Sequence, residues 1–209
     1  HNLYVLCHGP YGQNQSADSM SLGSAYVVKR VNNVSTPDDM IVASYVGRPN
    51  TQDEYNKNLF MLSDYYNCKI GFENDRGEVI AYAKRHRKMH RLQEEFEMLD
   101  KRELRSKTVK RQYGMHMTEA RKRQGEIYIR DWLNSVRSKN EKGEQILNLH
   151  KIYDLALLQE LIKFNHKGNF DRVMSLMIGM YHTRELYNAE VKEILEDNSA
   201  NNWFDKNYY

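Results

Sequence analysis

Residues 40–73, MIVASYVGRPNTQDEYNKNLFMLSDYYNCKIGFE, contain the pattern that decides the predicted fold. Residues 40–46 are mainly β-branched, aromatic or apolar and predict a strand. Thr51-Gln-Asp-Glu54 has the composition of a helix capping box. Apolar and aromatic side chains then recur at helical spacing, at Tyr55, Leu59, Leu62 and Tyr66. Lys69–Glu73 predicts a second strand that ends in a carboxylate, and the intervening crossover helix predicts that these two strands pair in parallel.

Two further strands are predicted before this stretch. Leu3–His8 is apolar and runs into a polar loop that contains Gly9, Pro10 and Asp18. Residues 25–31 predict a strand joined to the one at 40–46 by a long hairpin connection. Together with a helix expected over 78–87, this order predicts an α/β fold with a mixed β-sheet flanked by helices.

The apolar spacing that indicates helices and strands is weaker between residues 87 and 151. Residues 87–111 are charged and are predicted as helix and loop. Tyr113–Thr118 is predicted as an edge strand or turn, followed by a helix that carries Ile127 and Trp132. Residues 138–144 (SKNEKGE) have the composition of a loop.

The last third of the chain is predicted to be helical. Residues 152–164 are apolar enough for a helix that is buried on much of its surface. A second helix opens after Gly168-Asn169. Its apolar positions are Phe170, Val173, Met174, Met177, Ile178 and Tyr181. We expect a polar helix over 185–196 and a tail over 199–209.

Composition limits the class of protein. The chain has 209 residues, of which 40% are apolar and 28% charged, which suits one substantial domain and excludes a disordered or fibrous chain. No window approaches the roughly 18 uninterrupted apolar residues of a membrane span, so we expect a soluble protein without a membrane partner. Because Cys7 and Cys68 are the only cysteines, a disulfide framework and a cysteine zinc site are disfavoured and a reducing cytoplasm is expected.

The net charge of +3 is unevenly distributed. Residues 84–130 hold fifteen Lys and Arg and seven Asp and Glu, a balance of +8 that leaves −5 for the rest. A basic segment suits phosphate contacts with a nucleic acid, although a solvated mixed-charge face is the alternative explanation. The predicted DNA-binding residues are Lys84, Arg85, Arg87, Lys88, Arg91, Arg121, Lys122 and Arg123. His86 and His90 have the i, i+4 spacing of two metal ligands, but the surrounding cations favour a basic face.

Carboxylates stand at the ends of apolar elements. Glu73 ends a predicted strand, Asp171 lies in the first turn of the most apolar helix, and Asp18 follows the first strand. Carboxylates bind Mg²⁺ or Mn²⁺, and two such ions roughly 3.5–4 Å apart promote phosphodiester cleavage. Each residue taken singly has an ordinary explanation, as a strand end, a helix N-terminal charge or a turn former. The chain has no GxxxxGK[ST] phosphate loop, so ATP hydrolysis by that route is not expected.

Several segments together resemble one family. They are Asp18-Ser19, VASYVGRP at 42–49, Tyr65-Tyr66-Asn67, GFENDRG at 71–77 and NFDRVMSL at 169–176. In these segments and in the order of its elements, the chain resembles, over roughly residues 3–182, the C-terminal nuclease domain of the large terminase subunit of tailed bacteriophages. That domain belongs to the ribonuclease-H-like superfamily.

The resemblance implies a fold, an activity and partners. It implies a ribonuclease-H-like nuclease domain at 1–184, with a basic helical insertion at about 84–130 and a C-terminal helix and tail at 185–209. The implied activity is metal-dependent, two-metal endonucleolytic cleavage of concatemeric double-stranded DNA with little sequence specificity. The implied partners are double-stranded DNA, a portal protein, a small terminase subunit and a separate N-terminal ATPase domain. The implied location is the packaging motor on the procapsid, in the cytoplasm of the bacterial host.

The resemblance also assigns the site, with one departure. Glu73 and Asp171 match metal-binding and catalytic carboxylates of the family, and Asp18 matches an auxiliary acidic position. The family has an Asp directly after the first strand, where this chain has Gly9. Three explanations stand: a change that disarms the nuclease, a naturally degenerate site, or an alignment in which Asp18 is the first ligand. Asp18 or His8 could also supply a substitute ligand.

Two other functions remain open at this point. Gly9 makes a catalytically inert ribonuclease-H-like module for DNA binding or assembly a serious alternative. A junction resolvase or transposase of the same superfold is the other. An inert module predicts no metal-stimulated cleavage even with Asp at position 9, whereas a resolvase predicts a preference for four-way junctions.

Overall fold

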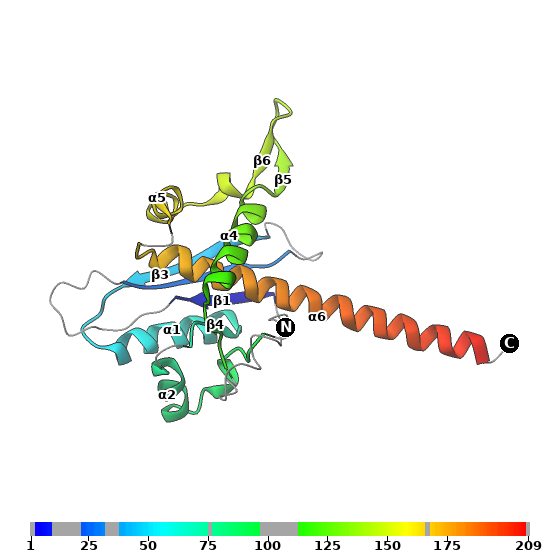
Figure 1. Ribbon diagram of the computed structural model, residues 1–209, viewed down its shortest axis with the longest axis horizontal. Helices are drawn as coiled ribbons and strands as arrows, with labels where there is room; N and C mark the ends of the chain where they lie inside the picture. Colours follow the sequence, from blue (N-terminus) through cyan, green and yellow to red (C-terminus); the bar gives the residue numbers. More distant parts are fainter. Residues whose placement is uncertain are drawn as a thin grey trace.

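The computed structural model describes residues 3–9, 22–31, 38–74, 77–96, 113–165 and 168–207 (Figure 1). Its centre is a four-stranded mixed sheet of order β3-β2-β1-β4. The strands are β1 (Tyr4–His8), β2 (Gly23–Lys29), β3 (Met40–Gly47) and β4 (Ile70–Phe72). β2 is antiparallel to both β1 and β3, whereas β4 is parallel to β1. The predicted α/β class with a mixed sheet is therefore confirmed.

The predicted partner of the fourth strand was wrong. β4 does run parallel to its neighbour, but this neighbour is β1 and not β3. The connecting helix α1 (Gln52–Tyr66) has 15 residues and is therefore about 22 Å long, which exceeds three strand spacings of about 4.8 Å. It can therefore carry the chain from one edge of the sheet to the other.

Helices cover both faces of the sheet. Side chains alternate along the strands, so that Leu6, Val27 and Phe72 pack beneath α1 and α2 (Glu78–Arg85). On the opposite face, Val5, Cys7, Tyr26 and Val28 pack against α6 (Asp171–Asn207). Each face therefore has its own hydrophobic core, and the strand ends emerge between the two helical layers.

The N-cap of α1 is at Thr51, as the sequence predicted, and one of the two hydrogen bonds of a capping box is present. Thr51 Oγ1 accepts a hydrogen bond from the backbone N–H of Glu54 at 3.1 Å. The helix ends at Asn67, which has a left-handed backbone with φ of 47°. Asparagine tolerates this conformation better than most residues, so the helix stops just before β4.

The basic segment at 84–130 is described in two parts, and residues 97–112 lie outside the described residues. The first part contains the end of α2 and the short 3₁₀ helix η1 (Met89–Arg91), after which Leu92 pairs with Ile70 at the sheet edge. In the second part, α4 (Glu119–Leu133) packs on α6 through the hydrophobic core that contains Ile129. The described basic residues therefore belong to elements that pack on the sheet and on α6.

The predicted loop at 138–144 belongs to a hairpin of β5 (Val136–Lys139) and β6 (Gln145–Leu147). Asn140 Oδ1 accepts hydrogen bonds from the backbone N–H groups of Lys142 and Glu144, which closes the turn. The polar composition predicted the turn and hid the short strands on either side of it. A second 3₁₀ helix, η2 (Asn148–Lys151), follows.

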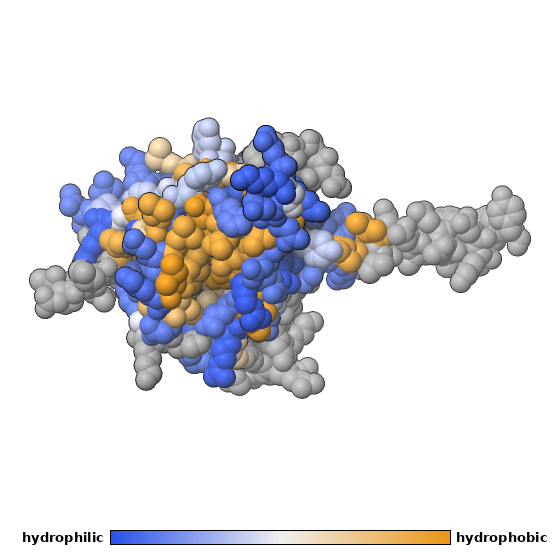
Figure 2. All heavy atoms as spheres, turned by 90° about the horizontal axis from the view of Figure 1, so that it is seen from above, coloured by the Kyte–Doolittle hydropathy of each residue, from blue (hydrophilic) through white to orange (hydrophobic). Residues whose placement is uncertain are grey.

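The two C-terminal helices also differ from expectation. α5 (Leu155–Lys163) packs by one side only, so that Leu157 is fully buried while Leu155 and Ile162 are 72% and 85% exposed. In Figure 2, apolar side chains cover the middle of the face seen from above. α6 continues to Asn207, through the predicted tail, because residues 182–207 contain no proline or glycine to end it. Its C-terminal half projects beyond the sheet (Figure 1).

Among the described residues, no helix combines the length and the apolar character needed to cross a membrane.

Candidate metal centre

Gly9, which has no side-chain atom to bind a metal, faces the start of α6. Val5 and Cys7 point from β1 toward α6, and alternation places position 9 on the same side. The Gly9 N–H donates to Ser175 Oγ at 2.8 Å. A Cβ atom on Gly9 would lie 2.7 Å from Ser175 Oγ and 3.0 Å from the carbonyl oxygen of Asp171. A side chain at position 9 would therefore point at the first turn of α6.

Glu73 lies beside Gly9 on the neighbouring strand. His8 is opposite Phe72 in the parallel pair, so Gly9 and Glu73 follow at the same sheet edge. A Cβ on Gly71 would contact His182 on α6, and alternation places Glu73 on that same face. The ends of β1 and β4 thus bring positions 9 and 73 together on the α6 face of the sheet, and position 9 adjoins the Asp171 backbone.

Asp171 is fixed in the first turn of α6. Its side chain is nearly buried, and Oδ2 accepts a hydrogen bond from the backbone N–H of Leu22 at 2.8 Å. Asn169 Nδ2 donates to the same oxygen at 3.4 Å. Because Leu22 immediately precedes β2, this contact ties the carboxylate to the sheet as well as to the helix.

Glu73 and Asp171 are the two described candidate ligands for a divalent cation. Glu73 and Asp171 supply carboxylate oxygens, which Mg²⁺ and Mn²⁺ prefer, and Glu73 Oε2 is shielded from solvent. Within the described ranges, no three His, Cys, Asp or Glu side chains are grouped closely enough to hold a metal ion. Gly9 has no ligand atom, and the predicted auxiliary Asp18 lies outside the described residues.

His8 is not placed to replace the missing ligand. Its ring points to the opposite face of the sheet, where Nδ1 lies 3.1 Å from the Tyr55 hydroxyl and 3.3 Å from the Ser24 carbonyl oxygen. Burial lowers the pKa of His8 to about 4. The residue is therefore a neutral part of the core beneath α1.

Ser175 was not predicted from the sequence. Besides accepting from Gly9, its hydroxyl lies 2.8 Å from the carbonyl oxygen of Ser24 and 2.9 Å from that of Asp171. These contacts join β1, β2 and α6 at the centre of the candidate site. Ser175 is a small polar residue among apolar helix positions, and no sequence pattern identifies it as the contact between these elements.

Acidic residues of α1 partly neutralise the first predicted DNA-binding cluster. Arg85 forms an ion pair with Asp53 at 2.6 Å, and Arg91 and Lys88 both pair with Asp64. Lys84 and Arg87 are exposed. Exposed ion pairs contribute little to stability, so phosphate groups can compete with these carboxylates.

The second cluster divides into buried and exposed members. Arg121 is buried, and its Nη1 donates to the carbonyl oxygen of His116 at 2.7 Å. Its guanidinium therefore does not face solvent as a phosphate contact would require. Lys122 pairs with Glu119 at 3.2 Å, and Arg123 is exposed.

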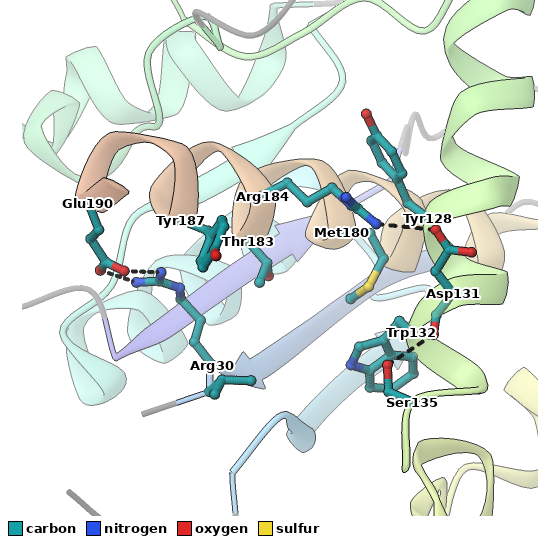
Figure 3. Close-up of a pocket in the computed structure, with 11 residues that line it drawn as sticks. Arg30, Tyr128, Asp131, Trp132, Ser135, Met180, Thr183, Arg184, Tyr187 and Glu190 are labelled. Atoms are coloured by element: carbon teal, nitrogen blue, oxygen red, sulfur yellow. Dashed lines mark hydrogen bonds and ion pairs between the residues drawn. The ribbon is translucent and has the colours of Figure 1, made fainter. Parts of the chain in front are cut away.

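A groove of about 650 Å³ lies elsewhere, between α4, α6 and the end of β2 (Figure 3). Arg30 forms two 2.9 Å hydrogen bonds with Glu190 at one end. At the other end, Arg184 pairs with Asp131 and lies 4.0 Å from the centre of the Tyr128 ring. The charges of these residues are matched, and the α6 lining begins nine residues after Asp171, so the groove is separate from the candidate metal centre.

No protein-family model, curated protein or solved structure matches this chain.

Proposed function

We propose that this chain is a metal-dependent endodeoxyribonuclease domain of the ribonuclease-H-like type, similar to the nuclease domain of phage large terminase subunits. The observation that carries the proposal is the convergence of position 9, Glu73 and the first turn of α6 at one edge of the sheet. These three segments are far apart in the sequence, and the family resemblance assigns a metal-site position to each of them.

The strand order supports the same proposal. Three antiparallel strands are followed by a helix and a fourth strand parallel to the first, and a late helix begins with an acidic residue. This is the order of elements that the ribonuclease-H-like fold implies. Glu73 at the end of β4 and Asp171 at the start of α6 are the residues to which the resemblance assigns metal binding.

The chain's own residues have distinct roles in the proposed reaction. A divalent cation, when bound, would polarise the scissile phosphate and stabilise developing negative charge. Glu73 and Asp171 would hold that cation, and the Leu22 N–H fixes the direction of the Asp171 carboxylate. The exposed Lys84, Arg87 and Arg123 would contact the DNA backbone, which gives affinity without sequence preference.

The second candidate function is a catalytically inert ribonuclease-H-like module for DNA binding or assembly. It is favoured by Gly9, which has no ligand atom. With two carboxylates and no residue that bridges them, the described site should bind a cation weakly and cleave slowly. In either case, the partners that we propose are double-stranded DNA, a portal protein, a small terminase subunit and a separate ATPase domain in the host cytoplasm.

Plasmid nicking with Mn²⁺ separates the two candidates. We expect Gly9→Asp to increase nicking, and Glu73→Ala or Asp171→Ala in that background to abolish the increase. Because a Cβ at position 9 crowds Ser175 Oγ, Gly9→Asp/Ser175→Ala should be tested in parallel. If both versions fold and neither nicks faster than the unmodified chain, the nuclease proposal is wrong and the inert module is favoured. A preference for four-way junctions would instead indicate a resolvase.

A further inference from the structure

Glu160 on α5 contacts the N-terminus of α6 directly. Its Oε2 accepts hydrogen bonds from the backbone N–H groups of Arg172 at 3.0 Å and Val173 at 3.4 Å. Its Oε1 accepts from Arg172 Nη1 at 2.8 Å. One carboxylate on a neighbouring helix thus caps the turn that contains Asp171.

The first N–H groups of a helix have no partner within the helix, and the helix dipole makes this end positive. A carboxylate placed there restrains the turn and is itself stabilised. Since Asp171 immediately precedes the two capped residues, restraint of their N–H groups also restrains the backbone that directs its carboxylate.

The same contact keeps the Arg172 guanidinium on the α5 side. Arg172 Nε lies 3.8 Å from Asp154 Oδ2, which also accepts a 2.7 Å hydrogen bond from the Tyr26 hydroxyl. Asp154 Oδ1 in turn caps α5 by accepting from the N–H groups of Ala156 and Leu157. β2, α5 and the start of α6 are therefore joined by one polar network.

We infer that Glu160 is a positioning residue for the candidate metal centre, because its cap on α6 fixes the turn that carries Asp171 and holds the Asp171 carboxylate against the Leu22 N–H. The part of this inference that concerns metal binding rests on the proposed function. A readout that needs no metal comes from the Leu22 amide, which donates to Asp171 Oδ2.

The first test is amide hydrogen exchange of Glu160→Ala and Glu160→Gln. Glu160→Ala should accelerate exchange at Leu22, Arg172 and Val173 by about tenfold or more. Glu160→Gln keeps a side-chain oxygen for the two N–H groups and should stay close to the unmodified protein. Leu59→Ala, in the core under α1, is the control for general destabilisation and should not accelerate these amides selectively. Unchanged Leu22 exchange in Glu160→Ala overturns the inference whether or not metal binds.

The second test is Mn²⁺ titration followed by electron paramagnetic resonance, well below each unfolding temperature. Glu160→Ala should weaken Mn²⁺ binding about tenfold, as removal of an outer partner of a metal ligand does, whereas Leu59→Ala should not. Equal losses in Glu160→Ala and Leu59→Ala would contradict the positioning role. If Mn²⁺ binding is unaffected by Glu73→Ala and Asp171→Ala, the proposed metal-dependent function is wrong. The hydrogen-exchange result for Leu22 would then decide whether Glu160 positions Asp171.

Discussion

Lowering the pH from 6.5 to 5 should destabilise this fold through two buried histidines. Burial lowers the pKa of His8 to about 4. Burial, with Arg30 and Lys69 nearby, lowers the pKa of His182 to about 3. In the unfolded chain both side chains titrate near their ordinary pKa of about 6.5. Between pH 6.5 and 5 the unfolded state therefore binds more protons than the native state.

The sign and size of the effect follow from proton linkage. Stability falls as pH decreases wherever the unfolded state binds more protons. Over this range each histidine should cost about 1.5 kcal/mol, so the free energy of unfolding should fall by about 3 kcal/mol in total. This is a large fraction of the roughly 5–15 kcal/mol that stabilises a typical domain.

Urea unfolding at constant ionic strength, from pH 7 to 5, measures this dependence. His182→Leu removes one titrating group and should reduce the pH dependence by about half. Leu59→Ala, which removes no titrating group, should leave it unchanged. A free energy of unfolding that stays constant from pH 6.5 to 5, or a full loss that persists in His182→Leu, would refute the assignment to buried neutral imidazoles.

Three other changes test the packing and the basic surface. Leu157→Ala should lower the free energy of unfolding by about 2–5 kcal/mol because Leu157 is fully buried. Leu155→Ala, on the exposed side of α5, should lower it by less than about 0.5 kcal/mol. Chemical denaturation measures both values, and equal effects would contradict the orientation of α5. Asp39→Ala should cost about 3–5 kcal/mol, because it leaves the buried Trp132 indole N–H without its acceptor and removes one of the two acceptors of the Asn148 amide. An unchanged melting temperature would contradict this. Arg85→Ala/Arg87→Ala should reduce the slope of log affinity for duplex DNA against log salt by about 2, and an unchanged slope would exclude these residues from the interface.

The sequence predicted the sheet better than the helices outside it. Strands β1 to β4 and helix α1 were predictable because β-branched runs, a capping box and helical spacing each act locally. The pairing of β4 with β1 depends on where the crossover helix lands, which is not a local property. The exposure of Leu155 and Ile162 also depends on tertiary packing, since an apolar helix at the periphery has the same composition as a buried one.

Some residues of the candidate site could also be predicted from the sequence, and others could not. Glu73 and Asp171 were candidates because they are acidic residues at the ends of apolar elements, and the structure places Glu73 next to Gly9 in the sheet and the Asp171 backbone close to Gly9. Glu160 and Ser175 act through contacts with residues brought near by folding, so no spacing in the sequence marks them. The burial of Arg121 was equally hidden, because a run of three basic residues does not show which side chain faces inward.

Diffraction from crystals soaked in Mn²⁺ tests the central claim most directly. We expect an anomalous peak within coordination distance of carboxylate oxygens of both Glu73 and Asp171, and loss of that peak in Asp171→Ala. A peak confined to another site, such as His86 and His90, or carboxylates too far apart to share one ion, would contradict it.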